Sequence, residues 1–181
     1  MSHIAVPARD AAPAASQPLL DAVQTQLGVV PNLFRLVALS PAALQGFLGL
    51  NGALAKALDV KTRERIALAV AQVNGCDYCL SAHTYLGLNL AKIDGAEIAL
   101  NRHGASSDPK AHAAVAFARK LAEHHGRGAE AELQAVRAAG YTDAQAIEII
   151  AVVAENIFTN MVNTVAGTDI DFPVVLAGEA A

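Results

Sequence analysis

Residues 74–83 read NGCDYCLSAH and hold both cysteines of the chain, Cys76 and Cys79, with His83 four residues after the second. The Asn-Gly pair at the start of this stretch breaks helices, so one helix ends near residue 74 and another begins at about Cys76. The cysteines then occupy the first turn of the new helix, where unpaired N–H groups and the helix dipole favour a thiolate. Because residues three and four apart share a helix face, Cys76, Cys79 and His83 form one stripe.

Glu64 lies in the helix that precedes this break. If the two helices fold back as an αα-hairpin, Glu64 is ten residues before the turn and His83 is eight residues after it. At about 1.5 Å of rise per residue, the two then lie within roughly 3 to 5 Å of the same depth along the hairpin. We therefore expect the Glu64 carboxylate to orient the His83 imidazole, which would activate Cys79 as a nucleophile. Cys76 would resolve the product that Cys79 forms.

The composition favours packed helices around this hairpin. Of the 181 residues, 54% are hydrophobic but only 4% are aromatic, and there is no Trp, so aliphatic side chains supply the core. The length fits one domain with a substantial core. We expect residues 1–16, which are rich in alanine and proline, to be a flexible arm, and residues 17–181 to form a single helical domain.

Caps and prolines mark the expected helices along the chain. No strand-like alternation of useful length is visible, so the prediction is an all-α fold. The expected helices and their signals are residues 18–27 (Pro18, closing Gly28), 31–39 (Pro31), 41–58 (Ser40 cap, Pro41), 63–74 (Thr62 cap), 76–90, 109–125 (Asp108 cap, Pro109), 129–139 (closing Gly140) and 143–165 (Thr142 and Gln145 as a capping box).

Charge and hydropathy limit the partners and the cellular compartment that we expect for this protein. The formal net charge is −4 and the cations are scattered, so nucleic acid is not an expected partner. No apolar run approaches the roughly twenty residues of a membrane span, and the N-terminus has no apolar signal core. We therefore expect a cytoplasmic protein without a membrane partner. A closely spaced cysteine pair in that compartment usually has a redox or metal-binding task.

Each candidate residue also has a plainer interpretation. Glu64 alone could be a first-turn carboxylate that interacts favourably with the helix dipole. His83 alone could be a hydrogen-bonded helix histidine, and the two cysteines could be small packing residues. A zinc site is the main structural rival: Cys76, Cys79 and His83 would supply three ligands and Glu64 a fourth. The ranking from the residues is a redox centre first, a metal site second and packing residues third.

The spacing can be written E-x11-C-x2-C-x3-H, from Glu64 to His83, within ERIALAVAQVNGCDYCLSAHTYLG. This pattern resembles the core of the AhpD-like alkylhydroperoxidases, in the carboxymuconolactone decarboxylase superfamily. Residues 28–48 and 155–173 are also similar to the peroxidase-related branch of that superfamily. The resemblance implies an all-helical subunit that assembles into trimers or hexamers and reduces hydroperoxides through a cysteine pair, without metal or haem.

Carried onto this sequence, the resemblance implies a role for each residue of the pattern. Cys79 would attack the peroxide and become a sulfenic acid, and Cys76 would condense with it to a disulfide. His83 would activate Cys79, and Glu64 would belong to the proton relay. No bound cofactor is implied, but an external dithiol must reduce the pair, and a lipoyl group on a partner protein or a thioredoxin-like protein fits that task.

Tyr78 departs from the pattern of alkylhydroperoxidase D itself, which has a histidine immediately before the second cysteine. A phenol, with a pKa near ~10, does not shuttle protons at neutral pH as an imidazole does. A tyrosine here resembles the peroxidase-related branch, and the cysteine pair argues against the lactone decarboxylase activity. The prediction is a thiol-dependent peroxidase. The alternatives are a redox-sensing or other thiol-disulfide protein without turnover, and a structural zinc protein.

Overall fold

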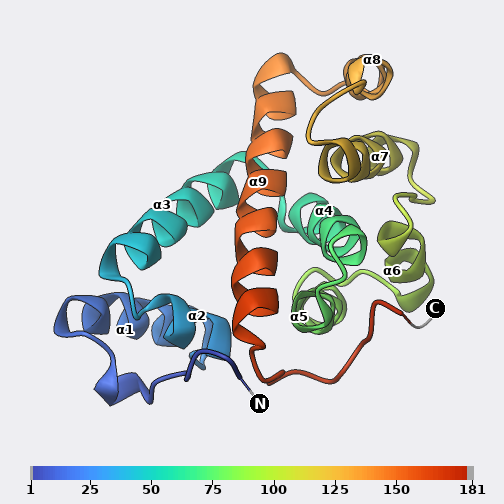
Figure 1. Cartoon of the computed structure of the whole chain (residues 1–181). Helices are drawn as coiled ribbons and strands as arrows, with labels where there is room; N and C mark the ends of the chain where they lie inside the picture. Colours follow the sequence, from blue (N-terminus) through green and yellow to red (C-terminus); the bar gives the residue numbers. More distant parts are fainter. Residues whose placement is uncertain (1, 179–181) are drawn as a thin grey trace.

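The structure is a computed structural model and describes residues 2–178. These residues form nine α-helices, two short 3-10 helices and no strand, which confirms the all-α prediction (Figure 1). The 3-10 helices are Arg9–Ala11 and Ala14–Ser16, within the arm whose flexibility stays a prediction. The α-helices are α1 (Gln17–Leu27), α2 (Asn32–Val37), α3 (Pro41–Ala57), α4 (Val60–Val73), α5 (Asp77–Asn89), α6 (Gly95–Arg102), α7 (Pro109–His124), α8 (Glu130–Ala138) and α9 (Asp143–Ala166).

The cap of α4 differs from the prediction. Thr62 was expected to cap this helix, but the N-cap is Asp59, and the helix begins at Val60. The Asp59 carboxylate accepts hydrogen bonds from both the backbone N–H of Thr62, at 3.0 Å, and its hydroxyl, at 2.7 Å. Because Asp59 pairs the free N–H of the third helical residue, the helix begins three residues before the predicted start at residue 63.

Helix α6 is absent from the sequence prediction. Its N-cap is Asp94, whose side chain accepts a hydrogen bond from the backbone N–H of Glu97 at 2.9 Å. At 8 residues α6 is too short for a clear apolar period, and the cap was its main local signal.

Helix α4 forms the centre of the fold, with α5, α6, α7 and α9 packed around it. Six consecutive residues of α4, from Ile66 to Ala71, are buried, so this helix has no solvent-facing stripe over its second half. Helix α9 passes between α4, α5, α6 and α7 on one side and α1, α2 and α3 on the other (Figure 1). By length and composition α9 could span a membrane, but 50% of that stretch is buried inside the fold.

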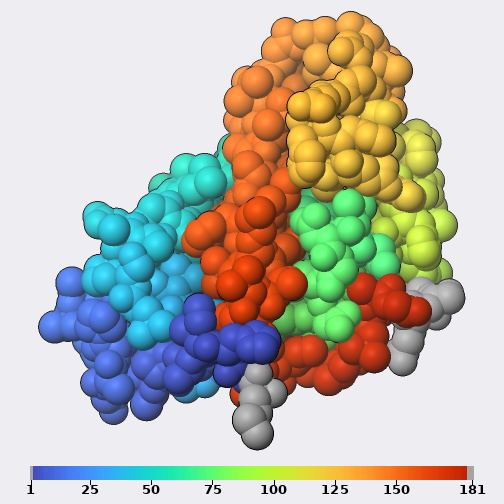
Figure 2. All heavy atoms as spheres, in the orientation of Figure 1, coloured from blue at the N-terminus to red at the C-terminus, as the bar shows by residue number. Residues whose placement is uncertain are grey.

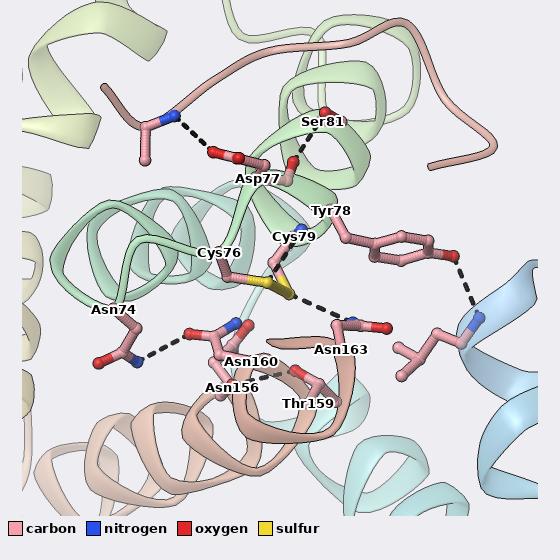
Figure 3. The surroundings of a disulfide bond; sticks show 12 residues. Asn74, Cys76, Asp77, Tyr78, Cys79, Ser81, Asn156, Thr159, Asn160 and Asn163 are labelled. Carbon is pink, nitrogen blue, oxygen red and sulfur yellow. Dashed lines mark hydrogen bonds between the residues drawn. A yellow bond between two sulfur atoms is a disulfide. The ribbon is translucent and has the colours of Figure 1, made fainter. Parts of the chain in front are cut away.

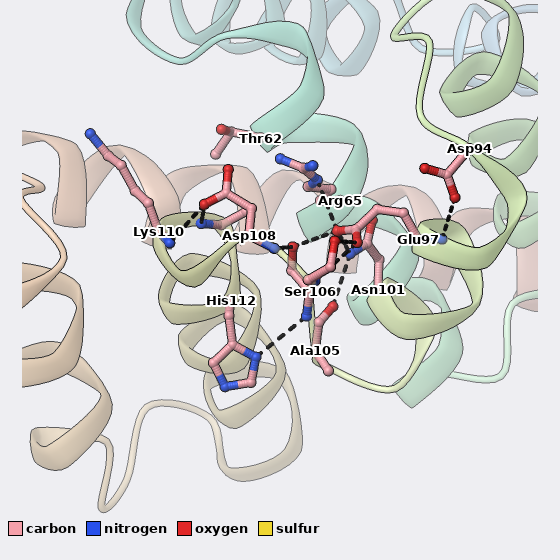
Figure 4. Close-up of polar contacts among 12 residues, drawn as sticks. Thr62, Arg65, Asp94, Glu97, Asn101, Ala105, Ser106, Asp108, Lys110 and His112 are labelled. Carbon is pink, nitrogen blue, oxygen red and sulfur yellow. Dashed lines mark hydrogen bonds and ion pairs between the residues drawn. The ribbon is translucent and has the colours of Figure 1, made fainter.

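A buried carboxylate fastens the loop after α6 to the central helix (Figure 4). Glu97 is 5% exposed and accepts hydrogen bonds from Asn101, Ser106 and Ser107, and it lies 3.4 Å from the Arg65 guanidinium. Burial alone would raise the pKa of Glu97, but these hydrogen bonds outweigh it and lower the pKa to about 2. Because Arg65 follows Glu64 directly, this cluster also fixes the part of α4 that carries the candidate relay.

We expect the Glu97 carboxyl to make the free energy of unfolding fall in acid. A carboxyl whose pKa is about 2 when folded and 4.5 when unfolded stabilises the fold above pH 4.5, and this contribution is lost as the pH falls towards 2. The shift corresponds to about 3 kcal/mol at most. Urea unfolding at pH 7 and pH 3 should show that Glu97→Gln lowers stability at pH 7 and flattens the pH dependence. Glu123→Gln, in a surface pair with Arg119, is the control, and an equal pH dependence in parent and Glu97→Gln would contradict the expectation.

Candidate active site

The two cysteines are joined as a disulfide at the start of α5 (Figure 3). Gly75 takes a positive φ of 63° that turns the chain out of α4, and Cys76 is the N-cap of α5. The backbone N–H of Cys79 donates to the Cys76 sulfur at 3.3 Å. Both cysteines are only 2% exposed. The predicted placement in the first turn is therefore confirmed, and both sulfurs lie in the core.

The αα-hairpin brings Glu64 and His83 together as its geometry predicts. Nδ1 of His83 lies 2.8 Å from Oε2 of Glu64, and both side chains are largely buried. With α4 beginning at Val60, Glu64 is the fifth helical residue, beyond the first turn in which the dipole acts most strongly. The Glu64 carboxylate therefore interacts with the His83 imidazole and not mainly with the helix dipole. Within residues 2–178, no hydrogen bond joins His83 to either cysteine, so the second half of the expected relay rests on the four-residue spacing along α5.

A second carboxylate lies near the same imidazole. Glu155 on α9 is 8% exposed, and one of its oxygens is buried without a hydrogen-bond partner. Burial raises the pKa of the Glu155 carboxyl, while Asn51, Arg63 and His83 oppose the shift. His83 therefore lies in an environment with two buried acidic groups, one bonded to it and one nearby.

Amide side chains of α9 line the other side of the disulfide (Figure 3). Asn163 donates from Nδ2 to the Cys79 sulfur at 3.4 Å, and Asn160 accepts from Nδ2 of Asn74 at 2.8 Å. These contacts were not predicted from the sequence. A signal was present, because Asn156, Asn160 and Asn163 recur at helical spacing on one face of an otherwise apolar helix.

Tyr78, which replaces the histidine of alkylhydroperoxidase D, is a structural anchor. Its hydroxyl accepts a hydrogen bond from the backbone N–H of Leu33 at 3.1 Å, at the start of α2, and interacts with the Asp171 carboxylate. Burial raises the pKa of the Tyr78 phenol far above its usual value, and Asp171 adds to the shift. The phenol therefore stays protonated and takes no part in a proton shuttle at neutral pH.

The segment after α9 covers the start of α5. The backbone N–H of Ala177 donates to the Asp77 carboxylate at 2.8 Å, and that of Val175 donates to the Ser81 hydroxyl at 2.9 Å. Apolar side chains of the segment, Ile170, Phe172 and Val175 among them, pack on the cluster that contains the cysteines. The segment therefore fixes the first turns of α5, on which both cysteines lie.

The ligands proposed for zinc are not assembled. The cysteines are bonded to each other and His83 is bonded to Glu64. In the part of the chain that the structure describes, no three His, Cys, Asp or Glu side chains come together in a way that could hold a metal ion.

A sequence comparison matches part of the chain to a known family. Residues 41–120, which run from the start of α3 into α7 and include Glu64, both cysteines and His83, match the carboxymuconolactone decarboxylase family. The chain carries a domain of this family. An uncharacterized protein of Haemophilus influenzae is 51% identical over 45 residues, which are 24% of this chain and 40% of that protein's length.

Solved structures share the fold of this protein over almost the whole chain. The alkylhydroperoxidase AhpD core of an uncharacterized peroxidase-related protein from Ralstonia eutropha JMP134 has a TM-score of 0.82 and 27% identity, covering 94% of this chain and 92% of its own. A peroxidase-related protein from Silicibacter sp. TM1040 has a TM-score of 0.78 and 23% identity, covering 99% and 96%. The debrominase Bmp8, with 2,3,4-tribromopyrrole, has a TM-score of 0.78 and 19% identity, covering 94% of each chain. The protein therefore has the AhpD-like fold.

Proposed function

We propose that this protein is a thiol-dependent peroxidase that reduces small organic hydroperoxides or hydrogen peroxide through Cys76 and Cys79. The observation that carries the proposal is the Cys76–Cys79 disulfide at the start of a helix, with the Glu64–His83 pair one turn further along. A helix start favours a thiolate, and a carboxylate-oriented imidazole is a suitable base for the neighbouring thiol. The AhpD-like fold and the cysteine pair are consistent with a peroxidase-related thiol protein.

The proposed cycle has two oxidative steps. The Cys79 thiolate attacks the terminal oxygen of ROOH, the O–O bond breaks, and ROH leaves after taking up a proton, so that Cys79 becomes a sulfenic acid. The Cys76 thiol then attacks this sulfur, a disulfide forms and water leaves. His83 takes the proton of the Cys79 thiol and is the source of the proton that ROH needs, while Glu64 holds the imidazole.

An external dithiol completes the cycle by thiol-disulfide exchange. A lipoyl group on a partner protein or a thioredoxin-like protein has the required chemistry. Since both cysteines are 2% exposed, the donor gains access only after side chains around the disulfide move. The same burial favours small peroxides over bulky ones.

The proposal is tested by mass spectrometry of the reduced protein before and after a brief peroxide pulse. We expect the peptide that contains Cys76 and Cys79 to lose two hydrogens and to regain them with dihydrolipoamide. Thiols that stay unmodified would remove the chemical basis of the proposal. A disulfide that forms once without sustained peroxide consumption in the presence of a dithiol would instead favour the redox-sensing alternative.

We also propose that copies of this chain associate through α9. Apolar side chains recur three or four residues apart on the exposed side of this helix, which runs across the face shown in Figure 2. Met161 is 63% exposed and Val165 is 68% exposed. Exposed apolar side chains that recur along one face of a helix are typical of interfaces. The stripe consists of Ile147, Ile150, Ala154, Phe158, Met161 and Val165.

Light scattering at micromolar concentration should therefore give an oligomer, with a trimer or hexamer as the expected size. Met161→Asp combined with Val165→Asp should reduce the mass to that of one chain. Gln134→Asp, on an exposed position of α8, should leave the mass unchanged. A parent protein that is already monomeric would refute the association.

A further inference from the structure

Asn163 is a buried amide whose donor faces the sulfur that the proposed reaction uses. It is 2% exposed, lies 84 residues after Cys79 in the chain, and donates from Nδ2 to the Cys79 sulfur at 3.4 Å (Figure 3). The opposite amide orientation would place a carbonyl oxygen against a sulfur that carries no hydrogen, either in the disulfide or in the thiolate. The contact therefore has a defined chemical direction, from amide N–H to sulfur.

The oxygen of this amide makes no hydrogen bond. Oδ1 of Asn163 is buried without a partner, and so is Nδ2 of the neighbouring Asn160. The orientation of the Asn160 amide is fixed by Asn74, whose Nδ2 donates a hydrogen bond to Oδ1 of Asn160 at 2.8 Å. Burying an amide with unpaired groups destabilises a fold, and an apolar side chain of similar size would avoid that cost. Stability alone thus gives no reason for an asparagine at position 163.

The contact changes in strength with the state of the sulfur. A disulfide sulfur is a weak acceptor, whereas hydrogen bonds to an ionised acceptor are roughly twice as strong as neutral ones. When the disulfide is reduced and Cys79 ionises, the same N–H group therefore stabilises the product more than the starting state. The start of α5 supplies a second stabilising influence, from the helix dipole.

We propose that Asn163 is a catalytic residue that holds negative charge on the Cys79 sulfur through its side-chain N–H group. The hydrogen-bonded side chains of Asn74 and Asn160 lie beside the Asn163 amide (Figure 3). The proposal concerns the same site as the proposed function and deepens it. Its test contains no peroxide, so a failure of the amide role and a failure of peroxidase activity give different results.

The test measures the thiolate of Cys79 alone, in protein with Cys76→Ser. Serine is a favoured N-cap, so this background preserves the start of α5. The rate of alkylation of Cys79 by iodoacetamide is followed against pH with and without Asn163→Leu. We expect the rate at neutral pH to fall about tenfold, which corresponds to one charge-assisted hydrogen bond of about 1.4 kcal/mol. The ionisable side chains of the site remain in both proteins: Asp77, Tyr78, His83, Glu64, Glu155 and Asp171.

A structural role for Asn163 predicts a different pattern. Asn163→Leu would then lower the thermal unfolding midpoint and leave the alkylation profile unchanged, which would overturn the proposal. Under the proposal the midpoint is unchanged or higher and the profile moves to higher pH. Asn163→Asp, which has the same shape but no N–H group, should move the profile in the same direction, and an unmoved profile in this variant would also overturn the proposal.

Asn156 supplies the matched control. It lies on the same face of α9 and is 6% exposed, but its amide donates to the carbonyl of Val152 in its own helix, at 2.8 Å. Asn156→Leu should leave the alkylation profile of Cys79 in place, and an equal shift in this variant would count against a specific role for Asn163.

In the unmutated reduced protein, NMR should show the side-chain amide signal of Asn163 titrating with Cys79. A signal independent of pH would contradict the proposal without any substitution at position 163.

Discussion

Replacing Cys79 with serine should abolish peroxide consumption, reducing it to the rate of buffer alone. A serine hydroxyl is almost wholly protonated at neutral pH and, unlike a thiolate, does not attack the O–O bond at a useful rate. The substitution is nearly isosteric, so the buried position, which is 2% exposed, should tolerate it. Peroxide loss is measured directly, with a dithiol present in excess.

The companion variant Cys76→Ser should behave differently. Cys79 would still react once with peroxide, but no thiol would be present to form the disulfide, so the sulfenic acid would accumulate. Trapping with a sulfenic-acid reagent, followed by peptide mapping, should place the adduct on Cys79. Full turnover in Cys79→Ser, or a sulfenic-acid adduct on Cys76 in that same variant, would refute the assignment of roles.

The break between α4 and α5 was predictable because its causes are local. Gly75 has a positive φ of 63°, a conformation that glycine adopts readily, and the Asn-Gly pair signals it in the sequence. The meeting of Glu64 and His83 then follows from helix geometry, since both positions are counted from one turn. The capping box of Thr142 and Gln145 is local in the same way and was predicted correctly.

The remaining features of the site depend on contacts across the chain. Asn163 and Cys79 are 84 residues apart, and the amide of Ala177 meets Asp77 over 100 residues. No local pattern fixes which face of α9 turns towards α5, or that the final segment returns over it. Tyr78 shows the same limit: its departure from the family histidine was visible, but its anchoring role depends on Leu33 and Asp171.

The second large effect should come from the Glu64–His83 pair. His83→Gln should slow the reaction of Cys79 with peroxide by about 100-fold, because general base catalysis typically contributes a factor of about 10² or more. Glu64→Gln should slow it less, since the imidazole remains but loses the carboxylate 2.8 Å from Nδ1. The rate is read from stopped-flow oxidation of the reduced protein, which isolates this step from reduction by the donor.

The double variant decides whether the two residues act as one unit. If Glu64 works only by orienting His83, its loss should add nothing once His83 is gone, so Glu64→Gln with His83→Gln should match His83→Gln alone. Independent roles would instead multiply the two effects. Glu123→Gln, which removes a surface carboxylate paired with Arg119, controls for a general loss of negative charge. A parental rate in His83→Gln would show that the imidazole is not the base for Cys79, and the helix start and the amide of Asn163 would then be the remaining groups on which activation of the thiol could depend.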